Sequence, residues 1–402
     1  MTISYEKALT ILLKRIEKSK KTEILAIEKT RGRRLAEDIY ATFDQPPFSR
    51  SPLDGYALRS QDIAGASADS PVKLNVIDQV TAGHCTDKTV TSGTAVRIMT
   101  GAPVPDGADC VIGQEDTDQR EDRVSVYCSL KSHQNICPKG EDFNKGDLLL
   151  EKGTLINSSS IGVLASAGIA RVKVGARPKV LLMSTGDELL LPGDAMRNGG
   201  IYDSNLFLIR SELESWGAEI VLARQVNDEP ENAAALCEEY AGKVDLIVST
   251  GGVSVGKKDI MHDVFRILDV ERLFWRVSVK PGMPVMAGVY NNTPLLALSG
   301  NPFGAFVTSQ LFIPPVLCRL SGDSCLGLEW REAILQNEYK KKSPVRRFLR
   351  SKFMDGKVTI IDKMNGNGTL SSLCRCNCLI DIPGGNEGMM PGDKVSVLMI
   401  KE

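Results

Sequence analysis

Residues 244–256 read Val-Asp-Leu-Ile-Val-Ser-Thr-Gly-Gly-Val-Ser-Val-Gly, a short apolar run that ends in a loop of glycine, serine and threonine. Similar apolar runs occur elsewhere in this part of the chain, at 179–183, 219–225 and 295–298. Segments with apolar residues at helical spacing lie between the runs, at about 205–216, 231–240, 259–268 and 303–317. This alternation predicts a largely parallel sheet with helices on both faces, over residues 178–322.

The rest of the chain divides into further parts. Residues 45–137 contain short β-rich runs between prolines and glycines, which predicts a small β-rich domain. The flanking stretches, 1–44 and 138–177, predict a mixed α/β domain into which the β-rich part is inserted, with Ser4 as the N-cap of a helix over 4–19. Residues 323–402 return to short strands separated by glycine and proline, which a small β barrel or sandwich would explain.

The composition is that of an ordinary globular protein of 402 residues, with 25% charged and 42% hydrophobic residues. A net charge of -1 provides no field to hold a polyanion, which argues against nucleic acid as a partner. The N-terminus lacks a signal-peptide pattern, and we expect no apolar run close to the roughly 20 residues that span a bilayer. Ten scattered cysteines without zinc-site spacing fit a cytoplasmic protein with no membrane segment.

Ligands of parallel α/β domains bind at the carboxyl ends of the strands, so the residues after each apolar run are informative. Glycines with serine and threonine at such positions let backbone N–H groups approach an anion. Each loop alone is more simply a turn or a helix cap, but together they favour a phosphate or oxyanion site. The candidate substrate-binding residues at this edge are Ser184, Thr185, Gly186, Asp187, Gly251, Gly252, Ser254, Pro284, Asn301 and Pro302.

Acidic residues share this rim, namely Asp187, Glu188, Asp228 and Asp259. Bare carboxylates would repel an anion unless a divalent cation bridged them, so the sequence predicts an anionic substrate with Mg²⁺. Glu188, Asp228 and Asp259 are the candidate metal ligands. The chain contains neither a P-loop nor a Rossmann glycine pattern, which argues against an ATPase or a dehydrogenase.

The motifs of the chain, taken in order, resemble those of the molybdopterin molybdenumtransferases, the MoeA family, which includes the E domain of gephyrin. They are Ser51–Ala57 (Ser-Pro-Leu-Asp-Gly-Tyr-Ala), Arg97–Asp109, Gly140–Asp142, Ser184–Leu189, Ile201–Asn205, Ser249–Gly256 with Asp259, Lys280–Gly282 and Gly300–Pro302. The resemblance covers nearly the whole chain, and Arg97–Asp109 with Ser249–Gly256 is its most specific part.

The resemblance implies a multidomain protein with a three-layer α/β molybdopterin-binding-type domain, a β-rich insertion domain, a small mixed domain and a C-terminal β barrel. It also implies an elongated homodimer whose active site lies in a cleft shared between subunits. The reaction of the family takes adenylylated molybdopterin and molybdate, releases AMP and leaves molybdenum on the dithiolene, assisted by a divalent cation, usually Mg²⁺. The upstream molybdopterin adenylyltransferase is an expected partner.

Site residues carried over by the same motifs come from several parts of the chain. Asp54, Thr100 and Asp142 match catalytic positions outside the α/β domain, whereas Glu188, Asp228 and Asp259 match acidic positions of the α/β rim. Lys280 would supply positive charge for phosphate or molybdate. The remaining substrate-binding candidates are Asp203, Ser204, Arg350 and Ser371.

The chain departs from the family pattern at several positions, which are Cys137, Met283, Ser299, Gly304 and Arg375. Met283 replaces a lysine, which deletes a charge near the expected oxyanion. One alternative is therefore a divergent paralogue that binds molybdopterin, uses Arg350 or Arg375 for the oxyanion, or inserts tungsten. The other is a non-catalytic scaffold on the same fold. The five acids Asp54, Asp142, Glu188, Asp228 and Asp259 favour an enzyme, because a scaffold has no need of them.

Overall fold

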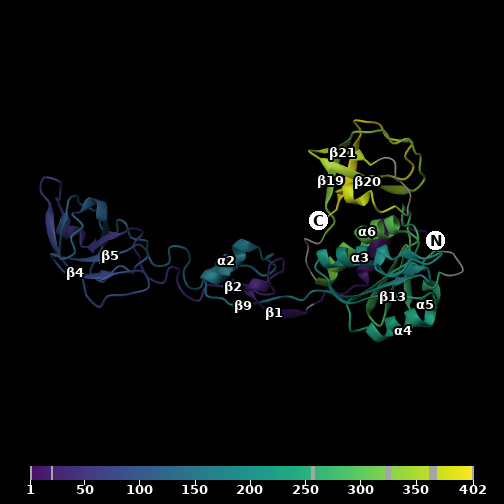
Figure 1. Cartoon of the computed structure of the whole chain (residues 1–402), viewed down its shortest axis with the longest axis horizontal. Coiled ribbons are helices and arrows are strands. Elements are labelled where there is room, and N and C mark those ends of the chain that lie inside the picture. Colours follow the sequence, from purple (N-terminus) through teal and green to yellow (C-terminus); the bar gives the residue numbers. More distant parts are fainter. Residues whose placement is uncertain (1, 20, 255–258, 322–326, 362–368, 401–402) are drawn as a thin grey trace. The chain divides into compact units, whose positions relative to one another are not determined.

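The structure, a computed structural model, describes residues 2–19, 21–254, 259–321, 327–361 and 369–400. It separates into two compact units (Figure 1). Unit 1 contains Met1–Glu23 and Gly175–Glu402, and unit 2 contains Ile24–Val174. Unit 2 is thus an insertion in the sequence of unit 1.

The central sheet of unit 1 has six strands in the order β13-β10-β14-β18-β17-β15. The neighbours β13, β10, β14 and β18 run parallel, and β17 pairs antiparallel with both β18 and β15. Their bounds are β10 Lys179–Thr185, β13 Glu219–Val226, β14 Leu246–Thr250, β15 Glu271–Trp275, β17 Met286–Tyr290 and β18 Thr293–Leu298. The predicted parallel-rich sheet is confirmed, and the antiparallel pair β15 and β17 is an addition to it.

Helices cover both faces of this sheet (Figure 1). Side chains alternate between two cores along each central strand: Leu182 and Val248 belong to one, Leu181 and Ile247 to the other. The first core is shared with α1 (Tyr5–Lys14), α3 (Ser204–Ser215) and α6 (Pro302–Ser321), and the second with α4 (Pro230–Tyr240) and α5 (Met261–Ile267). This arrangement is the predicted three-layer α/β domain.

The helix α6 corrects one expectation from the sequence. Among the described residues it is a 20-residue helix, long and apolar enough to cross a bilayer, although no such run was expected. However, 83% of the most apolar stretch of this helix is buried inside the protein. The helix also contains Pro314 and Pro315. It is the central helix of the first core, where a helix that is apolar on all sides is expected.

The C-terminal strands form a closed β barrel, as predicted. They follow the order β20-β21-β19-β23-β22, and a pairing of β22 with β20 closes the ring. The bounds are β19 Trp330–Leu335, β20 Arg346–Met354, β21 Lys357–Ile360, β22 Cys378–Ile382 and β23 Lys394–Met399. A short strand from the α/β part, β16 (Val279–Lys280), adds to β20 in parallel. Phe348, Leu379 and Leu398 of the barrel join the core around α6.

Unit 2 contains a five-stranded sheet in the order β6-β3-β5-β4-β7. Its strands are β3 Gly55–Leu58, β4 Val72–Val80, β5 Thr94–Ile98, β6 Cys110–Gly113 and β7 Arg123–Val126. The same unit contains the short elements β2 Ile39–Tyr40, β8 Leu148–Leu150 and α2 Ser158–Ser166. The paired strands β1 Thr22–Ala26 and β9 Arg171–Gly175 lie at the boundary between the two units. Asn157 caps α2, since its Oδ1 accepts the backbone N–H of Ser160 at 2.9 Å.

The N-terminal helix differs from the expectation in length and in neighbours. Ser4 is its N-cap as predicted, with Oγ accepting the N–H of Lys7 at 3.2 Å, but the helix ends at Lys14. It packs in unit 1, where Tyr5 contacts Phe312 of α6 edge-on and donates a hydrogen bond to the Leu311 carbonyl at 3.1 Å. The helix α1 therefore falls in unit 1, while the four-part division, with a mixed domain over 1–44 and 138–177, stays a prediction.

Candidate active site

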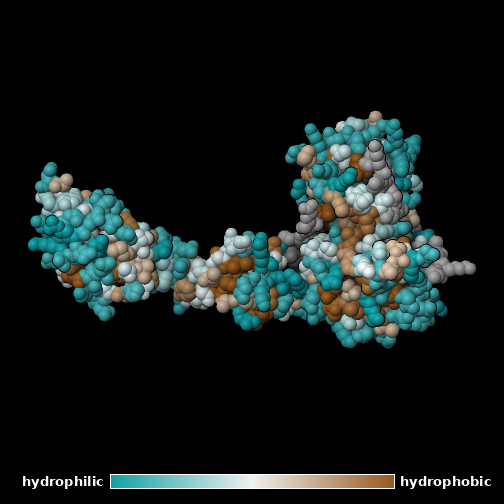
Figure 2. All heavy atoms as spheres, viewed as in Figure 1, coloured by the Kyte–Doolittle hydropathy of each residue, from teal (hydrophilic) through white to brown (hydrophobic). Residues whose placement is uncertain are grey.

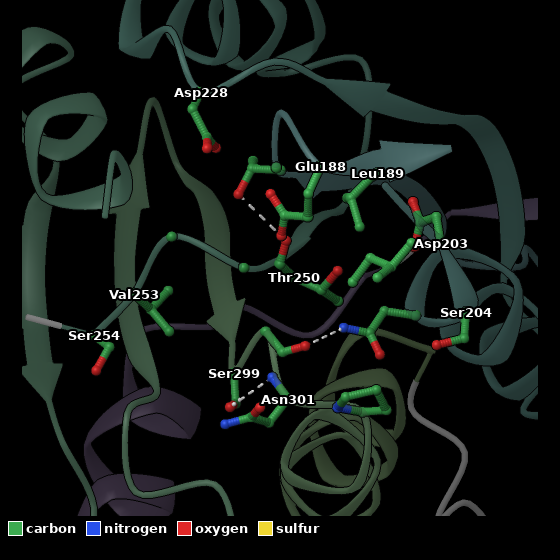
Figure 3. Close-up of a pocket in the computed structure, with 18 of the residues that line it drawn as sticks. Glu188, Leu189, Asp203, Ser204, Asp228, Thr250, Val253, Ser254, Ser299 and Asn301 are labelled. Carbon is green, nitrogen blue, oxygen red and sulfur yellow. Dashed lines mark hydrogen bonds between the residues drawn. The ribbon is translucent and has the colours of Figure 1, made fainter. Parts of the chain in front are cut away.

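A pocket of about 720 Å³ opens at the carboxyl edge of the α/β sheet. The loops after β10, β14 and β18 and the first turns of α3 and α6 form its walls (Figure 3). Many predicted site residues line it, namely Thr185, Gly186, Glu188, Asp203, Ser204, Asp228, Gly251, Gly252, Ser254, Asp259, Pro284, Asn301 and Pro302. The sheet edge therefore gathers in space what the sequence scatters over more than one hundred positions.

The loop after β14 requires glycine at two successive positions. Gly251 and Gly252 have φ of +93° and +65°, values that other residues rarely adopt. A Cβ atom on Gly251 would lie 2.5 Å from the carbonyl oxygen of Thr185 at the end of β10. The missing side chains let the backbone of this loop lie directly against β10 at the pocket wall.

Both helices at the pocket begin there, so their N-terminal amides and dipoles favour negative charge in it. Asp203 caps α3, because its Oδ1 accepts the N–H of Leu206 at 3.0 Å. Its other oxygen accepts a hydrogen bond from Ser184, which is buried and does not line the pocket. Ser184 thus contacts Asp203 from behind the pocket wall, and its predicted role in substrate binding stays a prediction.

The start of α6 is held by two short contacts. The N–H of Asn301 donates to Ser299 Oγ at 3.3 Å, and Asn205 Nδ2 of α3 donates to the Gly300 carbonyl oxygen at 2.8 Å. The second contact joins the first turn of α3 to the loop that precedes α6. The two helix N-termini are therefore fixed relative to each other at the pocket.

Carboxylates enter the pocket opposite the start of α6. Figure 3 shows Glu188 and Asp228 pointing into it from one side, with Ser299 and Asn301 on the other. Asp228 Oδ2 accepts the N–H of Asp187 at 3.3 Å, and Asp187 Oδ1 accepts the N–H of Asp228 at 3.1 Å. Asp187 itself lines a neighbouring hollow rather than this pocket.

The predicted metal ligands Glu188, Asp228 and Asp259 all line the pocket. Over the described ranges, however, no three His, Cys, Asp or Glu side chains are grouped closely enough to hold a metal ion. Among these described residues, Glu188, Asp228 and Asp259 are therefore not assembled into a dedicated three-carboxylate site. One or two carboxylates are nevertheless what Mg²⁺ commonly takes from a protein, with water and substrate phosphates as its other ligands.

Besides Ser184 and Asp187, three further predicted residues of unit 1 lie outside the pocket wall: Lys280, Arg350 and Ser371. Lys280 is exposed on β16, and Ser371 is exposed in a turn just before the short helical turn Leu373–Arg375. Arg350 is only 1% exposed, with its guanidinium carbon 3.5 Å from the centre of the Phe303 ring. It also donates to the carbonyl oxygen of Thr369 at 2.6 Å, and desolvation by burial lowers its pKa.

The predicted residues of unit 2 form one clear contact. Asp54 Oδ1 accepts two hydrogen bonds from Thr100, from the backbone N–H at 2.7 Å and from Oγ1 at 2.8 Å. These hydrogen bonds lower the pKa of the Asp54 carboxyl group. Asp142 is exposed in a turn, with its N–H donating to the Gln45 carbonyl at 2.9 Å. Catalytic roles for Asp54, Thr100 and Asp142 stay predictions.

Several residues of the pocket wall were missed as site residues by sequence reasoning. They are Leu189, Ile201, Tyr202, Asn205, Thr250, Val253, Ser299 and Gly300. A signal for Asn205 existed, because it follows Asp203 and Ser204 in the motif Ile201–Asn205 and falls in the first turn of the predicted helix. The contact of Gly300 with Asn205 depends on how α3 meets α6, which no local pattern indicates.

Comparison with known families gives matches along most of the chain. The model of the MoeA N-terminal region (domain I and II) matches residues 3–168. A probable molybdopterin binding domain matches residues 181–319, and the MoeA C-terminal region (domain IV) matches residues 332–400. The pocket lies within the second of these regions.

Individual relatives cover nearly the full length. The molybdopterin molybdenumtransferase of Staphylococcus aureus (strain COL) is 36% identical over 378 residues, which are 93% of this chain and 90% of the relative. The Staphylococcus epidermidis (strain RP62A) protein of the same name is 33% identical over 400 residues, 99% of this chain and 95% of the relative. A crystal structure of the molybdopterin biosynthesis MoeA protein from Pyrococcus horikoshii matches with a TM-score of 0.86 and 32% identity over 100% of both chains.

Proposed function

Because the chain belongs to the MoeA family, whose members named above are molybdopterin molybdenumtransferases, we propose that it inserts molybdenum into adenylylated molybdopterin with release of AMP. The family places it among the transferases of molybdenum cofactor biosynthesis. The observation that supports the specific reaction is the pocket, where two helix N-termini and a glycine loop meet several carboxylates. Its volume of about 720 Å³ is within the range of sites for ligands the size of a nucleotide.

Each group of the wall has a chemical task in this proposal. The first turns of α3 and α6 and the backbone at Gly251 and Gly252 bind the phosphates of the substrate. The carboxylates of Glu188, Asp228 and Asp259 orient a water molecule toward the phosphoanhydride, whose cleavage yields AMP. Molybdate is a substrate, and the two dithiolene sulfurs of molybdopterin bind its metal, so the protein needs no nucleophilic Ser, Cys or His of its own.

A dependence on Mg²⁺ is part of the proposal. A divalent ion there would be held by one or two of the carboxylates Glu188, Asp228 and Asp259, and by phosphate oxygens of the substrate. Its contribution would be to neutralise charge on the phosphates. The described residues support this division of ligands, since they contain no group of three that could hold the ion without substrate.

A homodimer with a site shared between subunits is the expected assembly. Asp54, Thr100 and Asp142 of unit 2 would then act at the pocket of a second copy. Unit 2 offers apolar surface for such contact: Figure 2 shows hydrophobic residues gathered near α2, β2 and β9. Large exposed hydrophobic side chains of this unit include Ile24, Tyr40, Leu148 and Leu155. A monomer in sedimentation analysis at micromolar concentration would contradict this assembly.

The experiment that tests the function is incubation with adenylylated molybdopterin, Mg²⁺ and either molybdate or tungstate, following AMP release. Release that depends on molybdate supports the proposal, and release that depends only on tungstate would support the divergent paralogue. No AMP with either oxyanion would support the scaffold alternative. The variant D259A should abolish release while the protein stays folded. The control variant D263A should not, because Asp263 is a half-exposed acid that pairs with Arg266 on α5 and does not line the pocket.

A further inference from the structure

Asn205 lies where a ligand in the pocket would meet it. It belongs to the first turn of α3, next to Ser204, and it lines the pocket. Only 8% of the residue is exposed, so its amide group is shielded from bulk water. A polar side chain buried to this extent normally has all its strong hydrogen-bonding groups satisfied.

The orientation of the Asn205 amide group is determined by its neighbour. Nδ2 donates to the carbonyl oxygen of Gly300 at 2.8 Å. Rotating the amide by 180° would place Oδ1 against that carbonyl oxygen, which sets two acceptors against each other. Oxygen and nitrogen of an amide are assigned from such partners, and here the assignment has one solution.

The Oδ1 atom is buried and has no hydrogen-bond partner within the described part of the chain. Burying an acceptor without a partner costs free energy, and a hydrogen-bond donor on a ligand would remove that cost. Asn205 thus presents a fixed, unfilled acceptor at the pocket wall. The structure marks this position as a place for a group that carries hydrogen.

Because Asn205 Oδ1 can only accept hydrogen bonds, the anionic groups of the expected substrate cannot be its partner. Phosphate and molybdate oxygens are themselves acceptors at neutral pH and would be repelled by an amide oxygen. A neutral amino or hydroxyl group can donate to it. We propose that Asn205 accepts a hydrogen bond from a neutral –NH₂ or –OH group of the substrate, either the amino group of the pterin ring or a hydroxyl of the AMP ribose.

This assignment rests on the proposed function and gives the charged and the neutral parts of the substrate different binding groups. The backbone amides of the helix starts and the glycine loop bind the charged part of the substrate, whereas Asn205 selects the neutral part. A site built around an amide acceptor rejects ligands that lack the matching donor, because the acceptor is then left buried and unpaired. Asn205 is therefore a specificity residue, tested by binding rather than by turnover.

Titration calorimetry with the full-length protein provides the test, using AMP and pterin as separate probes. The variant N205L keeps the branched shape of the side chain but has no acceptor, so affinity for one of the two probes should fall at least tenfold while affinity for the other is unchanged. Loss with pterin identifies the ring amino group, and loss with AMP identifies the ribose. N232L is the matched control, since Asn232 lies in the first turn of a different helix, α4, and does not line this pocket.

A comparison of ligands on the wild-type protein covers the case in which N205L does not fold. Lumazine replaces the amino group of pterin by oxygen, and 2′,3′-dideoxy-AMP lacks the ribose hydroxyls. One of these analogues should bind at least tenfold more weakly than its parent. Equal affinity within both pairs, or N205L binding both probes like wild type, overturns the assignment. Failure of the wild-type protein to bind either parent probe contradicts the proposed function itself and removes the basis of the assignment.

Discussion

Ser299 and Gly304 fit together because only one of them has a side chain. A Cβ atom on Gly304 would lie 2.9 Å from Ser299 Oγ and 3.2 Å from Ser299 Cβ. Ser299 uses this space to accept the N–H of Asn301 at the start of α6, and it is only 4% exposed. The sequence identifies both positions as departures from the family pattern, and in the structure the two positions are coupled by packing.

This coupling predicts a non-additive pair of substitutions. G304A alone should destabilise the protein by about 1–3 kcal/mol, because the added methyl group overpacks the contact with Ser299. S299G/G304A should regain much of that loss, since the second change removes the side chain that the methyl group meets. Urea unfolding of the single and double variants measures the coupling. Additive effects would show that the two positions are independent.

Arg350 is predicted to act on the structure of α6 rather than on the ligand. R350M removes both the hydrogen bond to Thr369 and the contact with Phe303 in the first turn of α6. Loss of a hydrogen bond from a buried charged donor should lower the free energy of unfolding by about 1.5–3 kcal/mol. AMP and molybdate affinity, measured by calorimetry well below the melting temperature, should change less than threefold. K352M, an exposed change on the same strand, is the control. Tenfold weaker molybdate binding with unchanged stability would instead restore the substrate-binding role expected from the sequence.

Gly251 should not tolerate a side chain. G251A introduces a Cβ atom 2.5 Å from the Thr185 carbonyl and places alanine at positive φ, so the loop after β14 must move. AMP affinity should fall at least tenfold. G193A shares the backbone strain, about 1–2 kcal/mol for a non-glycine residue in this region, but its Cβ meets nothing within 4 Å. Equal AMP affinity of the two variants would show that the glycine loop is not part of the binding site.

Glu212 on α3 should make stability depend on pH. Burial raises the pKa of its carboxyl group from 4.5 to about 7, although a hydrogen bond from Gln310 opposes the rise. The folded state therefore binds the Glu212 proton more tightly than the unfolded state does. The contribution of this group to the free energy of unfolding is fully present below about pH 4.5 and is lost as the pH rises through 7. The effect is at most about 3 kcal/mol.

Urea unfolding at pH 5 and pH 8 measures this effect. E212Q should remove this part of the decrease in stability between the two values. E214Q is the matched control, because Glu214 lies on the same helix with its side chain exposed and paired with Arg210. The same decrease in E212Q and in wild type would assign the pH dependence to other groups.

Thr100 should keep the Asp54 carboxylate ionised at low pH. T100V removes the hydrogen bond from Oγ1 while the backbone N–H remains, so the pKa of Asp54 should rise toward its ordinary value. The acid limb of the pH profile of AMP release should then move to higher pH. T89V, at an exposed position of the same unit, should leave the limb in place. A shift of equal size in T89V would exclude the specific contact as its cause.

The fold could be predicted where the burial of a strand shows as a continuous apolar run in the sequence. The runs that became β10 and β14 are buried on both faces, so their apolar character is continuous and easy to read. The strands β15 and β17 were missed: β15 is only partly buried, and β17 contains a glycine.

The site could be predicted where its residues follow the carboxyl end of a strand, and not elsewhere. Glu188, Asp228 and Gly251 each follow a strand, and all line the pocket. The sequence predicted that Arg350 binds substrate, but its burial depends on how the barrel meets α6, a long-range contact. Asn205 went unassigned because an unfilled acceptor is a property of three-dimensional surroundings, not of a motif.

The strand β16 has a consequence for how this protein can be divided. Val279 and Lys280 pair with Arg346 and Arg347 of the barrel, and Pro284, a few residues later, lines the pocket. A gene fragment ending at residue 322 would leave β16 without its partner strand and the core around α6 without Phe348. We therefore expect that the α/β layer of this chain is not stable without the barrel, and that any evolutionary exchange of its pocket-lining segment must bring a compatible barrel edge with it.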